Sequence, residues 1–127
     1  MTASAPAVSM EAADFSATAE TQEQTVSARL VGTADLNVKR ALDEFLVKLH
    51  ATAQAAHAAE VVMDFRSLKF MNSSCLKGLV TWICAVQELP VPNQYRIVLV
   101  SSPEMHWQRR SLHALSCLAT QLVTIQS

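Results

Sequence analysis

Two adjacent serines at the expected start of a helix are the residues of this sequence best placed to do chemistry. Asn72, Ser73 and Ser74 follow a largely apolar run and precede apolar residues at helical spacing. Asn and Ser are preferred at helix starts, because their side-chain oxygens accept hydrogen bonds from the free amides of the first turn. The positive end of the helix dipole lies there too, and it would stabilise an added phosphate. The pattern therefore indicates either a plain helix cap or a phosphorylated residue, Ser73.

Only positive charges surround Ser73 in the sequence. Arg66, Lys69 and Lys77 lie near it, and no Asp or Glu occurs between residues 65 and 87. A phosphate carries a charge of about −1.5 to −2 at neutral pH, which these cations would stabilise. We expect this region to form part of a partner-binding surface made of Lys69, Asn72, Ser73, Ser74 and Lys77.

Cys75 offers a different chemistry. A thiol at a helix start near lysines could have a lowered pKa and act as a nucleophile or redox sensor. The alternative is a buried structural thiol, which is the commoner state of a free cysteine and the one we expect for Cys84 and Cys117. Three cysteines without a C-x-x-C pair favour neither a disulfide framework nor a zinc site.

Residues 106–113, HWQRRSLH, form a second unusual segment. On a helix, the two His and two Arg residues would share one face, with Trp107 beside it. This face is either simply solvated or binds a protein, and in the second case Trp107, Arg109 and Arg110 would be its anchors. Two histidines seven residues apart without a third ligand do not make a zinc site, so we expect no metal and no other cofactor.

The elements that must position these residues alternate along the chain. Strands are expected at residues 14–19, 25–31, 59–65 and 96–100, with residues 59–65 covered on both faces, and residues 122–125 could add a final strand. Helices are expected to begin at Asn37, at residues 72–74 and at Ser102-Pro103-Glu104. This alternation predicts an α/β fold with a mixed central sheet of about four to five strands and three or more helices.

Size and composition fit a single domain. The chain has 127 residues, half of them apolar, and a net charge of −1. Residues 1–12 are expected to be disordered and residues 13–127 to form the domain. Without an apolar run of about 20 residues or a signal-peptide pattern, we expect a cytoplasmic protein with no membrane span. The part after residue 24 is only mildly basic, which argues against nucleic acid as a partner.

Several of these motifs together resemble those of STAS domains, the family of anti-sigma factor antagonists. In that family a strand ending in Asp leads to a turn, two apolar residues and then Asp-Ser-Ser-Gly-Leu at a helix start. The matching residues here are Asp64, Phe70-Met71 and Asn72-Ser73-Ser74-Cys75-Leu76. Residues 30–36, LVGTADL, are similar to the family's strand-Gly-x-x-Asp-Leu motif, and residues 98–103 to its last central strand ending in Ser-Pro. The resemblance covers roughly residues 25–125.

The resemblance implies both a fold and a function. In anti-sigma factor antagonists, a partner kinase that is also the anti-sigma factor phosphorylates the residue that corresponds to Ser73. The chain would then be a bacterial, phospho-regulated protein-binding switch in transcription regulation, not an enzyme, monomeric or weakly dimeric, with a serine kinase and a cognate phosphatase as partners. The alternative is an unphosphorylated STAS-like module that binds a protein or senses a small molecule, in which Asn72 and Ser73 only cap the helix.

Overall fold

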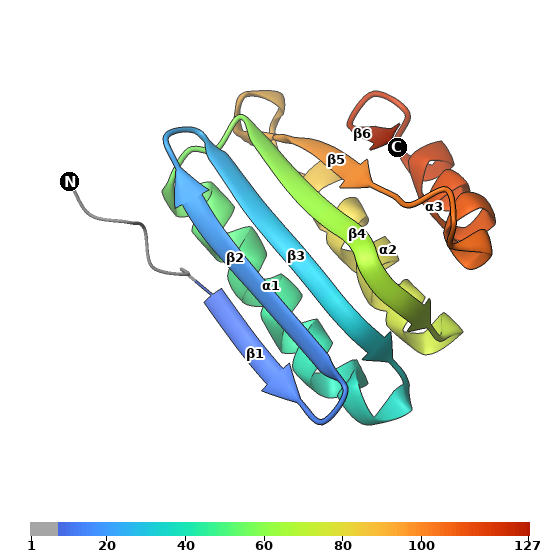
Figure 1. Cartoon of the computed structure of the whole chain (residues 1–127). Helices are drawn as coiled ribbons and strands as arrows, with labels where there is room; N and C mark the ends of the chain where they lie inside the picture. Colours follow the sequence, from blue (N-terminus) through green and yellow to red (C-terminus); the bar gives the residue numbers. More distant parts are fainter. Residues whose placement is uncertain (1–7) are drawn as a thin grey trace.

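In the computed structural model, which describes residues 8–127, a mixed β-sheet carries its helices on one face (Figure 1). The strands are β1 (Val8–Ala12), β2 (Phe15–Gln22), β3 (Thr25–Ala34), β4 (Glu60–Met71), β5 (Arg96–Val100) and β6 (Val123–Gln126). The helices are α1 (Lys39–Ala55), α2 (Ser73–Gln87) and α3 (His106–Leu118), with short 3-10 turns η1 (Leu36–Val38) and η2 (Val91–Asn93).

The strands lie in the sheet in their order along the chain. β1, β2 and β3 are antiparallel neighbours, whereas β3 to β6 run parallel. Each parallel connection moves in the same direction across the sheet, so right-handed crossovers place all three helices on one face. The α/β class and the mixed sheet are confirmed, and the described residues form six strands rather than four to five.

Strand β1 lies in the segment that we expected to be disordered. Val8 pairs with Ala19 and Ala12 with Phe15, and the Val8 side chain is buried. Backbone pairing with β2 orders this segment although its side chains are small, a contribution that composition does not reveal. The expectation of disorder is therefore wrong for residues 8–12, and the remainder of that expectation, for residues 1–7, lies outside the described residues.

The core fills the space between the sheet and the helices. Val61 and Met63 of β4 pair with Ile97 and Leu99 of β5, and all four side chains are fully buried. Val62 alternates with these residues and is only half-buried on the opposite face. The expectation that residues 59–65 are covered on both faces is wrong, because the helices cover one face only.

Helix α3 begins four residues after Ser102, the start that the sequence predicts. The Ser102 hydroxyl accepts a hydrogen bond from the Glu104 amide over 3.3 Å, and residues 103–104 form a turn. Ser side chains stabilise such local turns as readily as helix starts, which explains the difference.

Gln108 of α3 is a buried polar residue that the sequence does not single out. Its Nε2 donates to the carbonyl oxygens of Phe65 (2.6 Å) and Leu68 (3.1 Å), and its Oε1 accepts from the Ser102 amide (2.8 Å). β4 pairs with β5 only as far as Asp64. The Gln108 side chain thus replaces the missing strand partner and fastens α3 to the second half of β4.

Candidate functional site

Ser73 lies where the central parallel strands β3 and β4 end. The last pair of these strands joins Ala34 to Met71, and the Asn72 amide donates to the Ala34 carbonyl over 2.9 Å. Ser73 is the first residue of α2, and its side chain is exposed. The carboxyl ends of parallel strands are the usual place for functional sites in open α/β sheets.

The hydrogen bonds distinguish the two interpretations of the helix start, a plain helix cap or a modifiable serine at position 73. Asn72 has extended backbone angles, and its Oδ1 accepts from the Cys75 amide over 2.8 Å, so Asn72 is the N-cap. Among residues 8–127, no hydrogen-bond partner is found for the Ser73 hydroxyl. The fold therefore uses Asn72 as the cap, and it does not use the Ser73 hydroxyl.

We expect different stability effects at these two positions. Asn72→Ala removes the cap and should lower the free energy of unfolding by about 0.5 to 2 kcal/mol. Ser73→Ala should change it by less than about 0.5 kcal/mol, as at other exposed sites. Urea denaturation of both variants measures the difference. An equal loss in both would mean that Ser73 also supports the helix start.

The end of β3 meets the same helix start. Asp35 caps η1, because its Oδ1 accepts from the Asn37 amide over 3.0 Å. The expectation that Asn37 caps a helix is wrong, since Asn37 lies within η1 and α1 begins at Lys39. The Cys75 thiol donates to the Asp35 carbonyl over 3.4 Å, which joins the loop after β3 to the first turn of α2.

Cys75 is a structural residue. Its side chain is buried, and burial raises the pKa of its thiol. The hypothesis of a low-pKa nucleophile is therefore wrong. Cys84 and Cys117 are exposed, against our expectation of core thiols. Cys84 follows Cys75 by nine residues, about two and a half helical turns, which places it on the opposite side of α2.

The cations near Ser73 differ in their pairing. Arg66 forms an ion pair with Asp64, with 2.9 Å between Nη2 and Oδ2, and its guanidinium lowers the pKa of the Asp64 carboxyl. Lys69 and Lys77 are exposed and form no ion pair with another described residue. The expectation that a strand ends at Asp64 is wrong, because β4 continues to Met71 and pairs there with β3.

Two apolar side chains whose exposure the sequence does not predict lie at the same end of the sheet. Leu36 follows β3 and is 68% exposed, and Phe70 near the end of β4 is 47% exposed. The β3–β4 register shifts twice before this point. Such irregularities redirect the side chains that follow, so Met71 is buried and Phe70 faces solvent. Strict alternation from Leu68 would have predicted the reverse.

The residues singled out on α3 lie farther along the sheet. Trp107 is half-buried and its Nε1 donates to the Leu68 carbonyl over 3.3 Å. Arg109 and Arg110 line a hollow at the ends of β5 and β6. Ser73 is not among the residues that line this hollow.

Within residues 8–127, no helix is both long and apolar enough to cross a membrane. The same residues contain no group of three or more His, Cys, Asp or Glu side chains arranged to hold a metal ion.

Comparisons with known proteins identify the fold through structure. No family model matches the chain, and no curated protein matches its sequence. A crystal structure of an anti-sigma factor antagonist from Mycobacterium paratuberculosis superposes with a TM-score of 0.62 at 15% identity, over 88% of this chain and 85% of that chain. The anti-sigma factor antagonist SpoIIAA in its unphosphorylated form superposes with a TM-score of 0.45 at 23% identity, over 71% of this chain and 76% of that chain. The first superposition shows that the chain has the STAS-like fold of an anti-sigma factor antagonist, as the motifs predict.

Proposed function

We propose that this chain is a phospho-regulated protein-binding switch of the anti-sigma factor antagonist type, with Ser73 as the modified residue. The position of Ser73 carries this proposal. Its hydroxyl is exposed at the first residue of α2, and Asn72 makes the helix cap in its place. A kinase could therefore modify Ser73 without disrupting the fold.

The surface around Ser73 suits a protein partner. Leu36 and Phe70 provide exposed apolar groups at the ends of β3 and β4, and Lys69 and Lys77 provide free positive charge. Interfaces combine apolar anchors with a polar rim in this way. We infer that the partner presents apolar groups and acidic residues to this surface, with Asn72 and Ser74 as further contacts.

Phosphorylation would act on this surface through charge. A phosphate on Ser73 adds about −1.5 to −2 charges where the partner must exclude water and where acidic partner groups would approach. Lys69, Lys77 and the α2 amides would stabilise the modified form. The unmodified protein is therefore the binding form in this proposal, and the phosphorylated protein is the released form.

The partners follow from this scheme. A serine kinase that also acts as the anti-sigma factor would bind and modify the chain, and a phosphatase would restore the unmodified form. The chain is then a regulator and not an enzyme, and it acts in the cytoplasm of a bacterium, where ATP and the transcription machinery are found.

Mass spectrometry of peptides tests the modification. After incubation with ATP and a lysate of its own cells, the purified protein should carry one phosphate, and that phosphate should map to Ser73. Ser74→Ala is the matched control and should still be modified, whereas Ser73→Ala should not. A phosphate on Ser74, or modification that persists in Ser73→Ala, would refute the assignment.

A further inference from the structure

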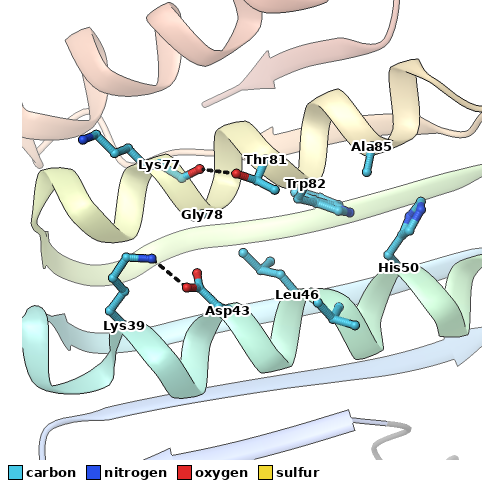
Figure 2. Close-up of a pocket in the computed structure, with 10 residues that line it drawn as sticks. Lys39, Asp43, Leu46, His50, Lys77, Gly78, Thr81, Trp82 and Ala85 are labelled. Carbon is cyan, nitrogen blue, oxygen red and sulfur yellow. Dashed lines mark hydrogen bonds and ion pairs between the residues drawn. The ribbon is translucent and has the colours of Figure 1, made fainter.

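A groove of about 340 Å³ runs between α1 and α2, and Ser73 is not among the residues that line it (Figure 2). Its middle is apolar: Leu46 and Val47 from α1 face Trp82 and Ala85 from α2. Val47 is 70% exposed, so this apolar surface is left uncovered by the fold. Pockets of this size and character are typical of small-molecule sites.

Small residues on α2 keep the groove open. Gly78 lines it, and a Cβ at this position would lie 2.5 Å from the Asp43 Oδ1 atom and 3.7 Å from the Leu46 side chain. Glycine inside a helix is unfavourable by about 1 kcal/mol relative to alanine. A Cβ at position 78 would push the end of the Asp43 side chain aside, and the small side chain of Ala85 also lines the groove.

One end of the groove is positively charged. The Lys39 Nζ lies 2.6 Å from the Asp43 Oδ2, and Lys77 lies at the same end without an ion pair among the described residues. Two cations therefore accompany one carboxylate. The other Asp43 oxygen, Oδ1, is buried and has no hydrogen-bond partner among the described residues. This end offers hydrogen-bond donors and net positive charge to an anion.

The opposite end presents a neutral donor, His50. The Trp82 Nε1 donates to the Tyr95 hydroxyl over 2.8 Å, and that hydroxyl lies 2.6 Å from the His50 Nδ1. Because Tyr95 is buried and has one proton, it donates this proton to Nδ1. The His50 proton must then be on Nε2, the ring nitrogen that remains free for a ligand. Burial lowers the pKa of His50, in agreement with a neutral ring.

We propose that this groove binds a linear dicarboxylate of medium length. One carboxylate would lie at the end of the groove that Lys39 and Lys77 line, and the methylene chain would lie against the apolar middle. The second carboxylate would accept a hydrogen bond from the His50 Nε2. Lys39 and His50 are eleven residues apart on α1, a rise of about 16 Å. This span and the donors at both ends favour a long molecule with an acceptor at each end. Lys77 belongs both to this groove and to the proposed Ser73 surface, so the groove is tested in the unmodified protein.

Trp82 provides the test. The chain contains two tryptophans, so a Trp107→Phe variant leaves Trp82 as the only indole and its fluorescence as a local signal. Decanedioate should change this fluorescence saturably and bind at least about tenfold more tightly than decanoate, which lacks the second acceptor. The diamine of the same chain length should not bind. Equal affinities for the three molecules, or no saturable change with decanedioate, would overturn the proposal.

A pair of charge variants then locates the site. Val47→Glu places a carboxylate in the groove at an exposed position and should weaken decanedioate binding by at least about tenfold without unfolding the protein. Lys48→Glu is the matched control, because it makes a larger charge change on the next residue of α1, outside the groove lining. Unchanged binding in Val47→Glu, with its thermal unfolding intact, would place the ligand elsewhere and overturn the assignment.

Discussion

Replacement of Leu99 by Asp should leave no folded protein. Leu99 lies in β5, pairs with Met63 and Ile125 in the neighbouring strands, and is fully buried. A carboxylate there must be buried without a partner, take up a proton or force local unfolding, and each route is unfavourable by several kcal/mol. The total stability of a domain is only about 5 to 15 kcal/mol. Circular dichroism should show the loss of cooperative unfolding.

Val98→Asp is the matched control for this prediction. Val98 is the neighbouring residue of the same strand, but it is half-buried on the face that the helices do not cover. A carboxylate there can reach water, so this variant should fold and should melt cooperatively. Cooperative unfolding of Leu99→Asp at the melting temperature of the unchanged protein would contradict the description of the core.

Gly32→Ala should have the next largest effect on stability. Gly32 has a φ of +102°, and a Cβ at this position would lie 2.0 Å from the backbone oxygen of Asp14. That oxygen accepts a hydrogen bond from the Thr33 amide over 2.7 Å, so the Asp14 backbone cannot move away from Gly32 without the loss of this bond. Strain and overlap together should lower the free energy of unfolding by about 2 to 4 kcal/mol, as urea denaturation would measure.

Gly78→Ala controls for the loss of glycine itself. Its Cβ would meet the end of the Asp43 side chain, which can move, and alanine gains helix propensity. We expect a change smaller than about 1 kcal/mol in either direction. If Gly32→Ala were no more destabilising than Gly78→Ala, the close approach of the β1–β2 turn to Gly32 would be refuted.

Local rules predicted the order of the elements and the helix start at Ser73. Apolar periodicity located the three helices and the central strands, since each signal lies within one segment. The cap at Asn72 is equally local, because a side chain three residues before an amide can bond to it in any fold. These rules predicted the α/β fold with a mixed sheet, and the resemblance to family motifs identified it as STAS-like.

Contacts between distant segments account for what the sequence did not reveal. The exposure of Phe70 depends on register shifts between β3 and β4. The burial of Gln108 depends on carbonyl groups of β4 that lack a strand partner. The order of Val8–Ala12 depends on pairing with β2. Each of these follows from how strands meet in space, which no single segment encodes.

The affinity of the partner before and after modification of Ser73 tests the central claim most directly. Isothermal titration calorimetry should compare the unmodified protein, the protein phosphorylated at Ser73, Ser73→Asp and Ser73→Ala, each with the protein that the unmodified chain captures from its own cells. We predict that phosphorylation and Ser73→Asp weaken binding by at least about tenfold, whereas Ser73→Ala binds like the unmodified protein. Equal affinity of the phosphorylated and unmodified proteins would contradict the switch.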